Sequence, residues 1–268
     1  MYKRQGFTGL GNEAITLTDT GSIAADTLLT VAQANSSGTV DASNAGTITG
    51  TAEEIIDAYA DSTITEASDV ALTVNTANSG TATLTQARSL DGLTTGVVTA
   101  TIAATDLSDL LDDSTPLLDA NGNNAFTITI GSGDAEVSAA DLNTLNGLTT
   151  VDIDAGNVTT ISSSTLDAIN TLYTSGGFSG LGDQDITASD SGSIAASTIT
   201  AIAAANSSGT LDVSGAATIT GTAAEIIAAF ADGTVTEASD VALTVNSGTA
   251  TLALSLIHIS EPTRLSWI

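Results

Sequence analysis

The 268-residue sequence contains 31 Asp and Glu residues against 4 Lys and Arg residues, which gives a formal net charge of −27. This balance argues against nucleic-acid partners and against anionic membrane surfaces, because both attract Lys and Arg, and no apolar run approaches the roughly 20 residues that insert across a bilayer. The absence of Cys excludes thiolate nucleophiles and thiolate metal sites.

The two ends of the chain differ in composition from the rest. Residues 1–5 carry two of the four basic residues, and residues 254–268 carry the only His and the only Trp. Both stretches resemble translated sequencing-adapter sequence, in the two expected orientations. We therefore expect residues 1–5 and 254–268 to be adapter-derived and poorly packed. The natural part is expected to be residues 6–253, an internal fragment of a longer protein.

Short amphipathic helices recur along this natural part. The second helix is typical: Thr51 and Glu54 form a capping-box pattern, and apolar residues follow on one helical face. The same pattern opens later helices at Ser138 with Asp141, Ser164 with Asp167, and Thr222 with Glu225. The predicted helices begin near residues 24, 51, 85, 105, 138, 162, 195 and 222, and the one near 85 fits the pattern poorly. Each has about two to three turns, too short to be stable alone.

Short alternating segments separate these helices and predict half-buried strands. The clearest are Thr39–Ala42, Val70–Val74, Phe126–Ile130 and Val151–Ala155. Several contain a Thr-x-Thr pattern with Ile or Val in the middle, which predicts an inward Ile and two outward Thr residues. These pairs are Thr47 and Thr49, Thr63 and Thr65, Thr127 and Thr129, Thr218 and Thr220, and Thr234 and Thr236.

A long internal repeat organises the whole sequence. Residues 6–75 and 177–246 align without a gap at an offset of 171, and roughly 48 of 70 positions are identical. The helix starts inside it predict coils of about 28 residues, which must stack to bury their apolar faces. With 42% hydrophobic residues, the acidic chain should fold. We expect one right-handed β/α solenoid of about eight coils, with a parallel sheet along one side and no separate domains.

Two resemblances bear on this expectation. Residues 142–158 resemble a leucine-rich repeat, with Asn157 near its asparagine position, but other coils lack that asparagine. A leucine-rich-repeat horseshoe therefore remains an alternative, as does a parallel β-helix. The sequences Ser-Ala-Ala-Asp-Leu-Asn-Thr-Leu (138–145) and Thr-Ile-Thr-Gly-Thr-Ala-Ala-Glu (218–225) resemble tandem repeats of very large cell-surface proteins of marine cyanobacteria. That resemblance covers nearly all of residues 6–253, and it implies an extracellular structural role without active residues.

Acid–base chemistry would have to rely on carboxylates, because the natural part contains no His, Cys, Lys or Trp. Asp152 and Asp154 share one strand face and are the best carboxylate pair, as glycosidases require. Sugar sites also need aromatic platforms, but aromatic residues are few, and Tyr59 and Phe230 lie on apolar helix faces. We therefore predict no catalytic residues and no enzyme, and keep a polysaccharide-acting enzyme as an alternative.

Calcium is the other ligand that the sequence raises. Residues 119–124 place oxygens at alternate positions after Asp112 and Asp113. The pattern departs from an EF-hand loop, because Gly occupies the fourth position and no Glu closes the loop. We predict a solvated turn, with no cofactor-binding or metal-ligating residue, and keep calcium as an alternative.

These observations favour a structural or adhesive repeat segment of a large secreted or cell-surface protein. Its expected partners are neighbouring repeats of the same chain and an unknown surface or polysaccharide, bound weakly by each coil and multivalently by the array. A calcium-stiffened or ice-binding module, suggested by the Thr pairs, is the alternative of a different class.

Overall fold

The computed structural model describes residues 11–75, 80–103, 105–112 and 122–247, and the chain divides into two compact units. Unit 1 comprises Met1–Thr129 with Gly147–Ile153, and unit 2 comprises Ile130–Asn146 with Asp154–Ile268. The repeat pattern had predicted one solenoid over 6–253. The prediction that residues 1–5 and 254–268 pack poorly falls outside the described residues.

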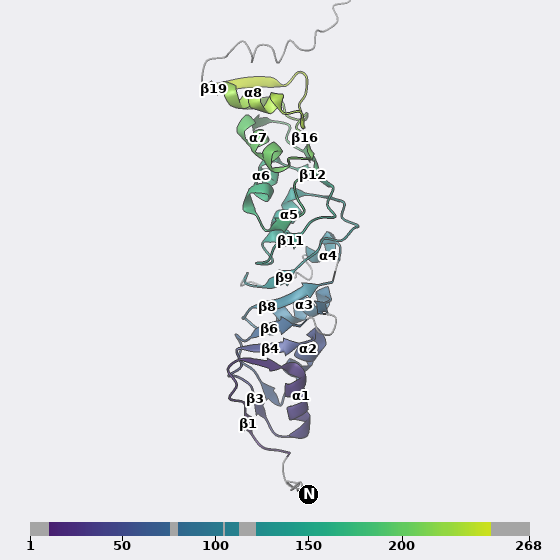
Figure 1. Ribbon diagram of the computed structural model, residues 1–268, viewed down its shortest axis with the longest axis vertical. Coiled ribbons are helices and arrows are strands. Elements are labelled where there is room, and N and C mark those ends of the chain that lie inside the picture. The colour runs from purple at the N-terminus through teal and green to yellow at the C-terminus, as the bar shows by residue number, and fades with distance from the viewer. Residues whose placement is uncertain (1–10, 76–79, 104, 113–121, 248–268) are drawn as a thin grey trace, which may run out of the picture. The chain divides into compact units, whose positions relative to one another are not determined.

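Unit 1 consists of short strands and helices in regular alternation. Its elements are β1 (Ile15–Thr16), β2 (Ser22–Ala24), α1 (Ala25–Ala34), β3 (Val40–Asp41), β4 (Thr47–Gly50), α2 (Ala52–Ala60), β5 (Ile64–Thr65), β6 (Ala71–Val74), β7 (Thr81–Ala82), α3 (Leu84–Asp91), β8 (Val98–Ile102), α4 (Leu107–Leu110) and β9 (Ala125–Thr127). They form a three-stranded sheet, β1-β3-β5, and a six-stranded sheet in which β2, β4, β6 and β8 follow one another and β7 and β9 both pair with β8. All these pairings are parallel. The helices α1, α2 and α3 lie along one side of the strands (Figure 1).

Unit 2 repeats this organisation. Its elements are β10 (Glu136–Val137), α5 (Ala139–Asn146), β11 (Ile153–Asp154), β12 (Thr160–Ser164), α6 (Leu166–Ser175), β13 (Phe178–Ser179), β14 (Asp185–Ala188), β15 (Ser193–Ala195), α7 (Ala196–Ala205), β16 (Thr210–Asp212), β17 (Thr218–Thr222), α8 (Ala223–Ala231), β18 (Val235–Thr236) and β19 (Ala242–Ser247). The sheets are β10-β12-β14-β16-β18, β15-β17-β19 and β11-β13. In the first two sheets every pairing is parallel. The described residues thus form an α/β fold with several parallel sheets, eight helices and no closed barrel.

The strand register defines the length of one coil. In unit 1, Ile23 pairs with Ile48, Ile48 with Leu72, and Leu72 with Val98, so the steps are 25, 24 and 26 residues. These steps are shorter than the 28 residues that the helix starts predicted. The distance from a strand to the following helix varies between coils: α2 begins two residues after β4 ends, whereas β7 lies between β6 and α3. Helix starts are therefore a less regular measure of the coil than the strand register.

Local hydrogen bonds fix where the helices begin. The predicted capping boxes of Thr51 with Glu54 and of Thr222 with Glu225 are both present, and Ser138 accepts from the backbone N–H of Asp141 at 3.1 Å. A further capping box, Thr83 with Gln86, opens α3. The predicted capping boxes all had an acidic fourth residue, whereas this one uses the amide of Gln86.

The predicted start of the sixth helix at Ser164 is wrong. The N-cap of α6 is Thr165, whose hydroxyl accepts from the backbone N–H of Ala168. Ser164 is 3% exposed, and its hydroxyl accepts from the backbone N–H of Ala139 at 2.7 Å. A tertiary contact between coils therefore takes the hydroxyl that the local pattern assigned to the cap.

The core is a thin seam between the strands and the helices. Ile48 on β4, Ile55 on α2 and Leu72 on β6 are fully buried, as the strand alternation and the helical spacing predicted. Thr47 and Thr49 flank Ile48 and lie half-buried on the opposite strand face. Each strand and each helix thus contributes only a few apolar side chains to the core.

Candidate functional site

The carboxylates proposed for acid–base chemistry serve turns or point to solvent. Asp154 Oδ1 accepts a hydrogen bond from the backbone N–H of Gly156 at 2.9 Å. Asp41 and Asp212 do the same for the second residue after each of them, at 3.0 and 2.8 Å. This contact lowers the pKa of Asp41, through the hydroxyl of Ser43 first and its backbone second. Asp152 is exposed, so each of the two candidate carboxylates has a role or setting that needs no catalysis.

The loop considered for calcium is described only in part. Asp113 and residues 119–121 lie outside the described residues. Asn124 is 1% exposed; its Oδ1 accepts from the backbone N–H of Val98 at 3.0 Å, and its Nδ2 donates to Asp91 at 2.6 Å. The prediction of a solvated turn is therefore wrong at Asn124, which joins neighbouring coils. In the part of the chain that the structure describes, no group of three or more His, Cys, Asp or Glu residues is arranged to hold a metal ion.

Two buried asparagines, one in each copy of the long repeat, make the same pair of hydrogen bonds to a neighbouring backbone. Asn206, 1% exposed, accepts from the backbone N–H of Gln184 at 2.9 Å and donates to its carbonyl at 2.7 Å. Asn35 makes the same pair of bonds with Glu13, at 3.1 and 2.7 Å. Each side-chain amide thus replaces a neighbouring backbone amide in the ladder. We call these two groups the asparagine nodes.

A glycine is required beside each asparagine node. A Cβ on Gly209 would overlap the amide nitrogen of Asn206 and the carbonyl oxygen of Gln184, and a Cβ on Gly38 would overlap the equivalent atoms of Asn35 and Glu13. The repeated Asn-Ser-Ser-Gly-Thr sequence contains the asparagine of each node and the glycine beside it. The motif can be recognised in the sequence. The residues that the asparagines bond to, Glu13 and Gln184, lie 22 residues away and could not be predicted from it.

A tyrosine covers the asparagine node of unit 2. The hydroxyl of Tyr173, on α6, lies 3.0 Å from Gln184 Oε1 and 3.2 Å from Asn206 Oδ1. Gln184 is fully buried, and its Nε2 donates to the carbonyls of Val158 and Gly180, both at 3.1 Å. Burial, and to a smaller extent the charge of Asp183, raise the pKa of Tyr173. The hydroxyl therefore stays protonated and acts as a donor between coils.

Two glutamates stand apart from the other carboxylates. Burial raises the pKa of Glu66 to about 7, and that of its repeat equivalent Glu237 to about 7. One carboxylate oxygen of each is buried without a hydrogen-bond partner among the described residues, as is the hydroxyl of Tyr59. Raised carboxyl pKa values mark candidate functional groups. Burial, and to a smaller extent the charge of Glu66, raise the pKa of the Tyr59 hydroxyl, so this hydroxyl lies within electrostatic range of Glu66.

The outer side of the five-stranded sheet in unit 2 carries the most regular exposed chemistry. The register aligns Glu136, Thr160, Asp185 and Thr210 in one row across four strands. Thr210 donates to Asp185 at 2.8 Å, and Ser162 donates to Glu136 at 2.6 Å. We call this row and Ser162 the hydroxyl–carboxylate face. It presents hydrogen-bonding groups at the strand spacing of about 4.8 Å, and it is the best candidate surface for binding.

The chain matches no protein-family model, no curated protein and no solved structure in these comparisons. Within the described ranges, no helix has the length and apolar character needed to cross a membrane.

Proposed function

We propose that the chain is a segment of a right-handed β/α solenoid that serves as a structural or adhesive repeat outside the cell, without catalysis. The observation that carries the proposal is that the duplicated block repeats its buried contacts as well as its sequence. Ile194 pairs with Ile219, and Ile219 with Leu243, as Ile23 pairs with Ile48, and Ile48 with Leu72. Duplication of a whole block extends an array but gives every copy the same side chains.

The buried and capping polar groups favour a structural role for the chain. The asparagine nodes, the capping boxes and the turn carboxylates all use their polar atoms to join or shape coils. The helices between the strands favour β/α coils over an all-β helix. The high negative charge favours solubility and repulsion between chains.

The hydroxyl–carboxylate face is the observation that favours an adhesive role. Its groups recur from coil to coil, so a polysaccharide or mineral with a repeating pattern can meet several of them at once. Single contacts of exposed groups are weak, and an array gains affinity from their number. The proposed partner is therefore an extended surface.

Array length provides the first test. We would produce residues 6–253 alone and with one or two further copies of the 171-residue block 6–176. At about 4.8 Å per strand step, each block of about seven coils should add about 34 Å to the longest dimension, measured by small-angle X-ray scattering. A maximum dimension that grows much less than this with each block would contradict the solenoid.

Adhesion provides the second test. Beads coated with acidic or neutral polysaccharide, or with calcium carbonate, would be incubated with the same length series. Retention on at least one coating should rise more steeply than the number of blocks, and E136Q with D185N should reduce it. The matched control neutralises Asp26 and Asp57, exposed residues of α1 and α2. Equal retention of all lengths would contradict adhesion, a chelator-sensitive rise in melting temperature would favour the calcium alternative, and thermal hysteresis would favour ice binding.

A further inference from the structure

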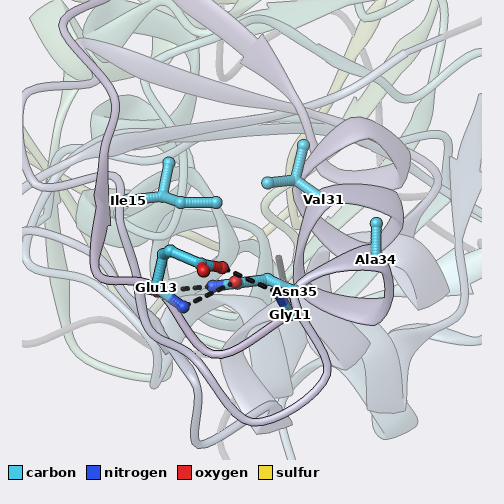
Figure 2. A pocket seen from close by; sticks show the side chains of 6 residues that line it. All are labelled: Gly11, Glu13, Ile15, Val31, Ala34 and Asn35. Carbon is cyan, nitrogen blue, oxygen red and sulfur yellow. Dashed lines mark hydrogen bonds between the residues drawn. The ribbon is translucent and has the colours of Figure 1, made fainter. Parts of the chain in front are cut away.

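An apolar cavity opens at the first described coil of unit 1. It has a volume of about 360 Å³ and is lined by Gly11, Glu13, Ile15, Val31, Ala34 and Asn35. In Figure 2, Ile15 and Val31 face each other across it, and the Glu13–Asn35 hydrogen bonds form its floor. Ile15 and Val31 are only half-buried. We call this lining the Glu13 face.

The duplicated block contains the same face in a covered form. The equivalents of Glu13, Ile15 and Val31 are Gln184, Ile186 and Ile202, which are 0%, 1% and 0% exposed. The coil that precedes them supplies the cover: β12 pairs with β14, and Tyr173 of α6 reaches Gln184 and Asn206. Unit 2 thus displays an occupant for a face of this shape.

The polar groups of the Glu13 face match that occupant. Glu13 Oε2 accepts from the backbone N–H of Gly11 at 2.7 Å and of Asn12 at 3.1 Å. Gln184 Oε1 accepts from the equivalent N–H groups at 2.7 and 3.2 Å. An oxygen therefore occupies the same position in both copies, and Asn35 Oδ1 matches Asn206 Oδ1. A tyrosine hydroxyl placed as in Tyr173 finds both acceptors.

We infer that the Glu13 face is a docking surface for a preceding β/α coil of the α6 type, whose helix carries a tyrosine that donates to Glu13 and Asn35. The inference rests on the stacked coils of the proposed function and is independent of adhesion. One difference sets the specificity. Gln184 Nε2 donates to two carbonyls of the coil and its neighbouring turn, whereas a carboxylate at 13 has no proton to donate. Where the coil before Gln184 offers the carbonyl of Val158 as an acceptor, the coil that fits Glu13 best therefore offers a hydrogen-bond donor to the Glu13 carboxylate.

A chimera tests this surface. Residues 130–176 would replace residues 1–5, joined directly to Gly6, so that the added α6 precedes Gly6 as the native α6 precedes Gly177. Hydrogen exchange measured by mass spectrometry on residues 11–38 should slow by about tenfold or more relative to the parent chain. A Tyr→Phe change in the added copy of Tyr173 should reverse part of that protection.

A second variant separates docking from general stabilisation. Glu13→Gln supplies a side-chain amide donor for the carbonyl of the added copy of Val158, as Gln184 does in unit 2. It should therefore slow hydrogen exchange further in the chimera and leave exchange unchanged in the parent. An equal effect of Glu13→Gln in both chains, or no added protection in the chimera, would overturn the inference. Two further outcomes would overturn the inference by showing a different occupant of the Glu13 face. Faster exchange after deletion of residues 1–5 from the parent would show that those residues cover it. Concentration-dependent protection with dimer formation in the parent would show that a second copy of the chain covers it. If the hydrogen-exchange test fails but the maximum dimension in small-angle X-ray scattering still grows with each added block, the solenoid proposal stands and only the docking inference is lost.

Discussion

The two copies of the long repeat, described over residues 11–75 and 182–246, have the same strand pairings but differ in how their buried polar groups are satisfied. In unit 2, Gln184 and Asn206 bond to each other and to Tyr173. In unit 1, Glu13 and Asn35 keep the bond between them beside an open cavity. The two copies therefore share the strand register and the asparagine bonds, and the node of unit 2 has in addition Tyr173 of α6 against it.

At a second position it is unit 1, and not unit 2, that carries the additional buried hydroxyl. Tyr59 on α2 corresponds to Phe230 on α8, and Glu66 and Glu237 follow seven residues later in both. The hydroxyl of Tyr59 is buried without a hydrogen-bond partner among the described residues, so here unit 1 carries the unsatisfied group. Substitutions made in both copies can separate the two effects.

The largest expected effect is at the glycines of the asparagine nodes. Gly209→Ala and Gly38→Ala place a Cβ into backbone and side-chain atoms, and we expect each to lower the free energy of unfolding by about 3 kcal/mol. Gly192→Ala and Gly21→Ala are the matched controls, because a Cβ at either meets no atom within 4 Å. Urea denaturation measures all four. Similar midpoints for Gly209→Ala and Gly192→Ala would show that the node is not tightly packed.

Truncation of the asparagines should give a smaller effect that differs between copies. Asn206→Ala leaves the backbone amide and carbonyl of Gln184 without their side-chain partner and removes one of the two acceptors of the Tyr173 hydroxyl, which costs about 2–3 kcal/mol. Asn35→Ala leaves fewer buried groups and should cost about 1–2 kcal/mol. Denaturation of both variants beside the parent measures the difference. A larger loss for Asn35→Ala would contradict the conclusion that the covering coil completes the node.

The two buried glutamates should make stability depend on pH. Their carboxyl pKa values are raised from 4.5 to about 7, so the folded protein binds more protons than the unfolded chain between these values. Stability is therefore highest below pH 4.5 for these groups, and it is lost as the pH rises through 7. After allowance for partial exposure, we expect a loss of about 1–2 kcal/mol per glutamate between pH 5 and pH 8.

Neutral substitutions isolate this effect. Thermal denaturation of E66Q with E237Q across that pH range should show a flatter dependence and a higher melting temperature at pH 8 than the parent. E53Q removes one exposed carboxylate from α2 and controls for net charge. If E53Q flattens the pH profile as much as the double change, general repulsion and not burial causes the dependence.

The smallest expected effect comes from exchanging the helix aromatic residues. Tyr59→Phe removes a buried hydroxyl without a partner and should stabilise the protein by about 0.5–1 kcal/mol. Phe230→Tyr introduces the same hydroxyl into unit 2 and should destabilise it by a similar amount. Chemical denaturation of both variants is the measurement. Destabilisation by Tyr59→Phe would indicate that the hydroxyl has a favourable contact in solution.

Local sequence patterns were enough to predict several of the individual elements. The capping boxes at Thr51 and Thr222 and the inward Ile48 follow from patterns that span three or four residues, and all are present. They were predictable because donor and acceptor, or neighbouring faces of one strand, belong to the same short segment. The internal repeat likewise predicted parallel strands, and the paired strands of both copies are parallel.

The strand-to-strand step and the polar contacts between neighbouring strands could be read only from the folded chain. The predicted helix starts gave a coil of about 28 residues, whereas the strands of unit 1 step by 24–26 residues. Ser164 matched a capping pattern, yet its hydroxyl bonds to Ala139, 25 residues earlier. The partners of Asn35 and Asn206 lie 22 residues away. Such contacts depend on the register between coils, which is set by the packing of the whole seam and is not encoded in any one segment.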